Sequence, residues 1–134
     1  MARSLSAIAL AAATLVVLLC ATQSEAKAKT FTVGGGGLSP WGFGVMTWKP
    51  SAPIHKGDFL KFSWKGIPHD VWLMNNVDAY NNCNFSAAKK KTGITSFGSY
   101  MYKVTSTASP LYFSCSVIGH CKADNMKVAI PITA

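Results

Sequence analysis

The chain has 134 residues, and its 13 basic side chains outnumber its five acidic ones to give a formal net charge of +8. That length suits one domain built around one hydrophobic core. Composition excludes nucleic acid as the expected partner, because the positive charge after residue 26 comes from lysine alone, whereas phosphate readers usually employ arginine.

The first predicted element is a secretory signal peptide over residues 1–26. Arg3 provides the positive charge of the N-terminal region, and an apolar run covers residues 5–21. Small residues, Ser24 and Ala26, stand at the −3 and −1 positions of a cleavage site before residue 27. The apolar run is shorter than the roughly 20 residues of a spanning helix, so cleavage is expected rather than a membrane anchor. Residues 27–134 are then expected to form one soluble, monomeric domain, secreted to the extracellular space or cell wall, without a lipid-anchor tail.

Short strands separated by turns are predicted along the rest of the chain. The expected strands, which alternate apolar and polar residues or are rich in aromatics, are 30–33, 59–64, 70–74, 100–104, 111–114 and 126–130. Residues 75–91 have room for a turn or two of helix, and the charge run 89–91 within them is expected to be a solvated loop. This spacing predicts an all-β fold, a Greek-key β-sandwich or barrel with little helix.

A candidate metal site lies near the C-terminus. Cys115, His120 and Met126 fall within twelve residues, and His69 follows a predicted turn far upstream. Two imidazoles, one thiolate and a weak axial thioether form the ligand set of a type 1 copper site, since soft sulfur suits Cu(I) and imidazole suits both oxidation states. We therefore expect one copper ion and electron transfer rather than enzyme activity, because four protein ligands leave no open position for a substrate. His55, which looks like a turn residue, is left out of the site.

The cysteines after residue 26 are odd in number. Pairing two of the three leaves one thiol in an oxidising compartment, where a free thiol needs a reason. A bridge between Cys83 and Cys121 leaves Cys115 for copper, whereas a bridge between Cys115 and Cys121 leaves Cys83 free. Residue types alone leave both pairings open.

Four segments together carry a family resemblance, and they are 69–71, 80–84, 112–121 and 126–130. The chain resembles the phytocyanins, plant extracellular blue copper proteins, and within them the plantacyanin-like subgroup. The resemblance extends over the expected domain from Thr30 to the final strand. It implies a cupredoxin Greek-key β-sandwich, copper on His69, Cys115 and His120, and a Cys83–Cys121 bridge.

The axial position departs from the family pattern. The family's axial residue usually falls five positions after the loop histidine, which is Asn125 here, whereas Met126 is the sixth. Because Met126 matches the start of the family's final strand, we interpret the loop before it as one residue longer. Asparagine tolerates the positive φ often supplied by glycine before the axial residue. Met126 is therefore the predicted axial ligand, and the alternatives are the Asn125 amide or no strong axial ligand at all.

Two other residues attract attention. Asn84 begins the sequence Asn-Phe-Ser, which is an acceptor for N-glycosylation in a secreted protein. Asp70 follows the first predicted imidazole ligand. Its carboxylate is expected either to orient an imidazole or to face water at a strand edge.

The expected partner is an unknown small redox molecule or redox protein, with electrons passing through an imidazole edge, that of His120. The basic charge also favours an acidic cell-wall polysaccharide, although a solvated basic surface without a specific partner explains it equally well. The alternative function is therefore a copper-independent cell-wall binding, structural or signalling module. Retention of both histidines and the cysteine argues against that alternative.

Overall fold

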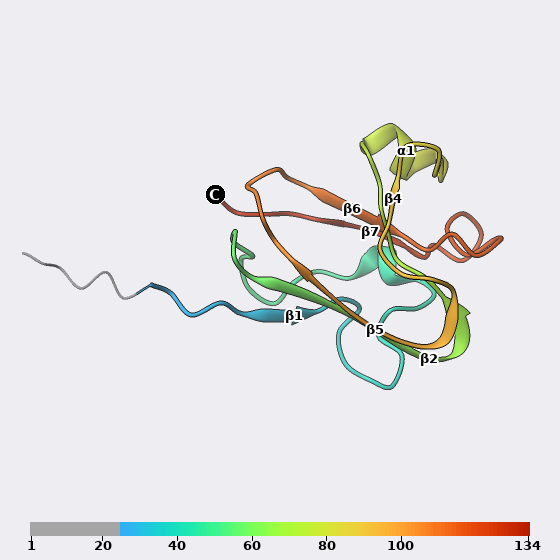
Figure 1. Ribbon diagram of the computed structural model, residues 1–134, viewed down its shortest axis with the longest axis horizontal. Helices are drawn as coiled ribbons and strands as arrows, with labels where there is room; N and C mark the ends of the chain where they lie inside the picture. The colour runs from blue at the N-terminus through green and yellow to red at the C-terminus, as the bar shows by residue number, and fades with distance from the viewer. Residues whose placement is uncertain (1–24) are drawn as a thin grey trace, which may run out of the picture.

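Two β-sheets stacked face to face make up the computed structural model, which describes residues 25–134 (Figure 1). The three-stranded sheet has the order β1 (Thr30–Thr32), β2 (Phe59–His69) and β5 (Thr95–Lys103). The four-stranded sheet has the order β4 (Lys89–Lys90), β3 (Trp72–Leu73), β6 (Leu111–Ser114) and β7 (Lys127–Ile130). The signal peptide predicted for residues 1–26 lies, but for its last two residues, outside the described range.

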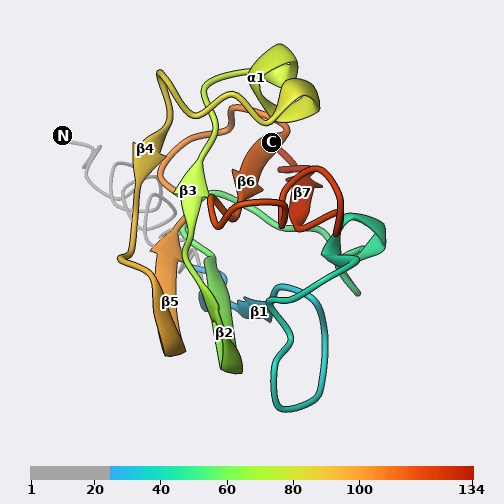
Figure 2. The same ribbon diagram turned by 90° about the vertical axis from the view of Figure 1, so that its right-hand side faces the viewer.

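The core lies between the sheets, and Figure 2 shows β4, β3, β6 and β7 in a layer above β5, β2 and β1. β1 pairs in parallel with β2, and the other pairs are antiparallel, with β2 and β5 forming the longest ladder. Phe62 of β2 packs against Phe113 of β6 with ring centroids 4.8 Å apart, and Trp41 meets Phe62 edge-on at 5.0 Å. These three rings are fully buried, so they contribute strongly to the burial of apolar surface that holds the layers together.

One glycine in β5 determines how a large aromatic packs beside the future site. Gly98 pairs with Trp64 across the ladder, and a Cβ at Gly98 would lie only 2.0 Å from the Trp64 ring. The indole therefore lies over the bare backbone of β5, and its Nε1 donates to the Thr95 carbonyl at 2.7 Å. This arrangement brings the Trp64 ring to 6.4 Å from the His69 ring.

Within the part of the chain that the structure describes, helix is limited to two short pieces. α1 covers Val77–Asn82, and its N-cap Asn76 accepts a hydrogen bond from the Ala79 N–H. A single 3-10 turn, η1, covers Val45–Thr47. Within residues 25–134, none of the helices has the length and apolar character needed to cross a bilayer.

The structure confirms the predicted all-β fold but changes several boundaries. β2 continues through the expected turn at 66–68 to His69, with an irregular register after Lys65. The strand predicted over 70–74 shrinks to Trp72–Leu73, and the Val71 N–H donates to the Thr92 side chain instead of to a neighbouring strand. β5 begins five residues before the predicted start at residue 100. The expected loop at 89–91 contributes the short strand β4, which pairs with β3.

Candidate metal centre

Three predicted donor groups converge at one end of the sandwich. The Nδ1 atoms of His69 and His120 lie 3.2 Å apart. Cys115 Sγ lies 3.9 Å from Nδ1 of His69 and 3.6 Å from Nδ1 of His120. Two imidazole nitrogens and one sulfur thus surround a space of the size of a single ion. The third histidine, His55, is not part of this cluster and forms an isolated β-bridge with Thr133.

Separate elements deliver these donors. His69 is the last residue of β2, and Cys115 directly follows β6. His120 stands in a turn closed by the hydrogen bond from its own N–H to the Val117 carbonyl, with Gly119 at φ 85° before it. The sheet framework therefore fixes two donors, and a hydrogen-bonded turn fixes the third.

Asp70 joins the two ligand segments. Its carboxylate is fully buried and accepts hydrogen bonds from the Ser116 N–H at 2.7 Å, from the Ser116 hydroxyl, and from Trp72 Nε1 at 2.7 Å. Its backbone carbonyl accepts from Trp41 Nε1 at 2.9 Å. Of the two expectations for Asp70, the exposed strand-edge position is wrong. The structure also gives the carboxylate no hydrogen bond to an imidazole, since its partners are Ser116 and Trp72.

Burial sets the protonation of the metal-free donors. It lowers the pKa of His69 to about 4, and the neighbouring His120 adds to the shift. Burial likewise raises the pKa of the Cys115 thiol to about 12, although backbone amides of Asp70 and Val117 oppose it by hydrogen bonding. At neutral pH the His69 imidazole is therefore a neutral donor, and the thiol must lose a proton before its sulfur can bind a metal.

The backbone around the predicted axial position ties it to the other donors. Met126 N–H donates to the His120 carbonyl at 2.9 Å, and the Met126 carbonyl accepts from Cys115 N–H at 3.0 Å. The Met126 side chain is fully buried in the same core cluster as Cys115. Asn125 is exposed and has φ 49°, the left-handed conformation expected for it from the sequence.

Phe43, which the sequence did not single out, lies against both imidazoles. Its ring centroid is 5.6 Å from that of His69 and 4.9 Å from that of His120, in edge-on contacts. Of the three clustered donors, His69 and Cys115 are buried and His120 is partly exposed. No spacing or motif in the sequence connects residue 43 with these rings, since the contact depends on how the 34–58 segment folds over the sheet ends.

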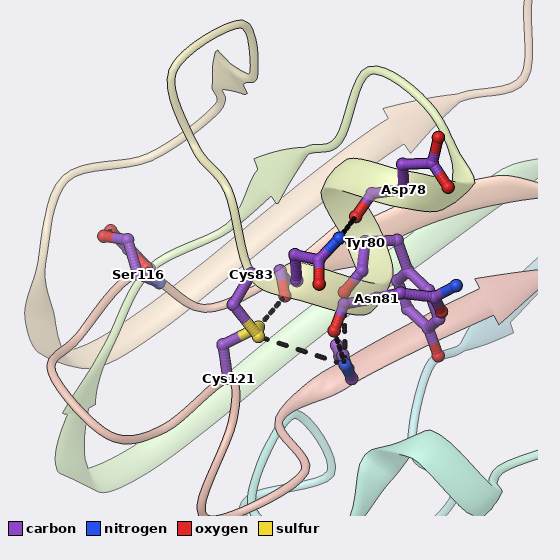
Figure 3. Close-up of a disulfide and its surroundings, with 10 residues drawn as sticks. Asp78, Tyr80, Asn81, Cys83, Ser116 and Cys121 are labelled. Carbon is purple, nitrogen blue, oxygen red and sulfur yellow. Dashed lines mark hydrogen bonds between the residues drawn. A yellow bond between two sulfur atoms is a disulfide. The ribbon is translucent and has the colours of Figure 1, made fainter.

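A disulfide braces the loop that carries His120 (Figure 3). Cys83 and Cys121 are bonded, and Cys115 is the free cysteine of the described residues. Cys83 caps the C-terminal end of α1, so the bridge connects that helix to the ligand turn. Lys127 reinforces the junction by donating from Nζ to the Tyr80 and Asn81 carbonyls, each at 3.1 Å. Of the two pairings left open by residue types, the structure has the one implied by the family resemblance.

Comparison with known proteins identifies the family to which this chain belongs. Residues 41–125 match the family model described as a plastocyanin-like domain. Chemocyanin of Lilium longiflorum is 30% identical over 122 residues, which cover 91% of this chain and 90% of chemocyanin. The chain belongs to the phytocyanin family. The resemblance noted in the sequence is thereby confirmed.

Other relatives agree with this assignment. The basic blue protein of Cucumis sativus is 30% identical to this phytocyanin over 100 residues, or 75% of this chain and 95% of the relative. The solved structure of cucumber basic protein, described as a blue copper protein, has a TM-score of 0.61 and 28% identity, covering 78% of this chain and 99% of its own. Spinach plantacyanin has a TM-score of 0.52 and 25% identity, with the same coverage. The cupredoxin fold predicted from the sequence is confirmed.

The donor chemistry of this phytocyanin fits the cofactor of its family. Two imidazoles and a thiol held within 3.9 Å of one another, with a buried thioether in the adjoining core, match the donor types of a type 1 copper site. Hard cations such as Mg²⁺ and Ca²⁺ prefer oxygen donors, which this cluster lacks. The cofactor is one copper ion.

Proposed function

We propose that this phytocyanin is an extracellular one-electron carrier whose copper is bound by His69, Cys115 and His120, with Met126 as the axial ligand. The convergence of two Nδ1 atoms and Cys115 Sγ within 3.9 Å carries the proposal. Copper bound by such a set alternates between Cu(II) and Cu(I), and the protein sets its potential through the axial ligand and the hydrogen bonds around the sulfur.

The chain's own contribution is to hold the donors still. A carrier exchanges electrons quickly when its ligand geometry changes little between oxidation states, so a rigid donor framework is useful. Three features supply this rigidity. The Asp70 carboxylate accepts hydrogen bonds from Ser116, and the Met126 backbone is hydrogen-bonded to the backbones of Cys115 and His120. The third feature is the Cys83–Cys121 disulfide. Burial of His69 and Cys115 also excludes water, which disfavours an open coordination position and with it an enzymatic role.

The His120 side is the proposed electron entry and exit. His120 is the partly exposed member of the donor cluster, and Phe43, 51% exposed, packs against its ring. A small redox molecule or redox protein that docks there would approach the imidazole edge directly. His69, by contrast, is 2% exposed and enclosed by Phe43 and Trp64.

A redox titration tests this function. The copper-loaded protein is expected to take up one electron per copper from a graded series of small inorganic couples and to return it reversibly, with the visible band bleaching and recovering in step. A Cys115→Ser variant serves as the control, because it removes the sulfur donor at an already buried position. Loaded protein that cannot be reduced and reoxidised reversibly would contradict the proposal.

We also propose that Asn84 is glycosylated and that residues 1–26 are removed during secretion. Asn84 is exposed, and its Oδ1 accepts a hydrogen bond from the Ser86 N–H at 3.0 Å. The loop therefore has the outward orientation that a glycan requires. Mass spectrometry of protein secreted by a plant cell checks both statements, since an unmodified chain that begins at Met1 would overturn them.

A further inference from the structure

A second surface feature lies apart from the metal centre, along the free edge of β1. It is a groove of about 710 Å³ lined by Lys29, Thr30, Phe31, Thr32, Gly35, Trp48, Lys49, Ser51 and Ala52. None of these residues belongs to the donor cluster. Figure 1 shows β1 in the left half of the view and the red loop between β6 and β7, which carries His120, at the right.

The groove combines positive charge with an aromatic surface. Lys29 and Lys49 are both exposed, and the lining contains no acidic residue. The nearby carboxylate of Asp58 is buried, since it accepts hydrogen bonds from the backbone N–H groups of Lys29 and His55, each at 2.8 Å. The Asp58 carboxylate is thus held by backbone groups of the turn, although its charge also attracts the Lys29 ammonium. Both lysine side chains are exposed and remain accessible to an anion.

Trp48 supplies the aromatic part. It is partly buried, packing against the core cluster, and it lines the groove. Gly35, with φ 87°, lies opposite, and a Cβ there would come to 3.9 Å from Trp48 Cδ1. The absence of a side chain at Gly35 therefore leaves this edge of the indole uncovered toward the groove.

Hydroxyl groups complete the lining. Thr30 and Thr32 alternate with the inward-facing Phe31, so their side chains share the outer face of β1. Ser51 is exposed and belongs to the same lining. An indole surface, several hydroxyls and two flexible lysine charges are thus gathered in one open groove.

We propose that this groove binds an acidic oligosaccharide whose negative groups are uronate carboxylates. The apolar C–H face of a sugar ring would pack on Trp48, ring hydroxyls would exchange hydrogen bonds with Thr30, Thr32 or Ser51, and carboxylates would pair with Lys29 and Lys49. Small phosphates fit less well, because they are best recognised by arginine forks or clustered backbone N–H groups, and the lining contains no arginine.

This site goes beyond electron transfer and does not depend on copper. A protein bound to an acidic polymer through the β1 edge would keep its His120 side free for a redox partner. The charge of the described domain, twelve lysines against four aspartates after residue 26, would add long-range attraction to the same polymer. The groove would then provide the specific contact, and the positive charge of the whole domain would provide the long-range attraction to the polymer.

Calorimetric titration with a galacturonic acid trimer tests the site, using its fully methyl-esterified form as the neutral probe. We expect the acidic trimer to bind both copper-loaded and metal-free protein. The double variant Lys29→Ala/Lys49→Ala should weaken binding about tenfold, which corresponds to about 0.7 kcal/mol for each of two exposed ion pairs. The matched control is Lys89→Ala/Lys90→Ala, which removes the same charge from exposed positions of β4 and should change affinity less than about twofold.

Two further measurements keep the test decisive. Ser51→Glu places a carboxylate in the groove at an exposed position and should abolish binding without disturbing the fold. The indole N–H signal of Trp48 should shift in an NMR titration of the unaltered protein. Equal weakening by the two lysine pairs, equal binding of the esterified trimer, or an unmoved Trp48 signal would each overturn the site.

Discussion

The carboxylate of Asp70 accepts a hydrogen bond from the backbone N–H of Ser116 at 2.7 Å, across 46 residues of sequence. Asp70 follows the His69 imidazole and Ser116 follows the Cys115 thiol, so this contact fixes the separation of two donor segments from different sheets. The Ser116 hydroxyl and Trp72 Nε1 donate to the same carboxylate, which leaves it fully paired despite complete burial.

Loss of the Asp70 carboxylate should destabilise the protein strongly. Asp70→Ala removes the acceptor of three hydrogen bonds and leaves three partly buried donors unpaired, so we expect the free energy of unfolding to fall by about 3 kcal/mol. Urea unfolding of the metal-free protein measures the change. Asp78→Ala is the control at an exposed position in the first turn of α1, where the cost should stay within about 1 kcal/mol. Equal stability of the two variants would contradict the bracing role of Asp70.

The axial assignment predicts opposite outcomes at neighbouring positions. Met126→Gln replaces a thioether by an amide oxygen and should shift the reduction potential and the copper spectrum, because the axial ligand tunes both. Asn125→Gly retains the backbone conformation with φ 49° and should leave both properties unchanged. Voltammetry and electron paramagnetic resonance of the two variants decide the matter. A reduction potential that changes in Asn125→Gly but not in Met126→Gln would assign the axial position to the Asn125 amide.

Removal of the disulfide should cost stability while preserving the donor set. The Cys83–Cys121 bridge closes 38 residues of chain separation, which corresponds to about 4 kcal/mol on the chain-entropy scale. We expect the double variant Cys83→Ala/Cys121→Ala to unfold at correspondingly lower urea concentration and still to bind copper with a visible band. If the copper spectrum disappears in a variant that remains folded, the bridge would be part of the donor geometry rather than a brace.

The metal-free protein should lose stability in mild acid. The pKa of His69 falls from 6.5 to about 4 on folding, so the folded chain resists protonation that the unfolded chain accepts. The stability of the folded state is therefore complete above pH 6.5 and declines as the pH falls from 6.5 to 4. The expected loss is about 3 kcal/mol. Urea unfolding at several pH values measures it, and the copper-loaded protein provides the comparison. A flat profile for the metal-free form would show that burial of His69 carries no such penalty.

Much of the candidate site followed from residue chemistry. Cys115, His120 and Met126 lie close in sequence, and few donor types suit a type 1 copper site, so the cluster with His69 could be predicted before the fold was known. The positive φ of Asn125 also followed from residue type. The all-β class followed from alternation and turn spacing.

The remaining features depend on long-range packing. Phe43 contacts both imidazoles only because a loop without sequence periodicity crosses the ends of the sheets. Asp70 was placed next to a ligand, but its partners Ser116 and Trp72 could not be read from spacing, since one lies 46 residues away. The continuation of β2 past the 66–68 segment could not be predicted either, because the pairing with β5 is interrupted after Lys65 and resumes only at His69, opposite Thr95.

The optical and electron paramagnetic resonance spectra of the purified protein with one equivalent of Cu(II) test whether the donor cluster forms a type 1 copper site. We expect an intense visible thiolate-to-copper charge-transfer band with a narrow copper hyperfine splitting. We also expect loss of the visible band in Cys115→Ser and its retention in His55→Ala, a histidine outside the donor cluster. A colourless protein whose copper gives the wide splitting of an ordinary surface site, or one equally affected by both substitutions, would contradict the type 1 assignment.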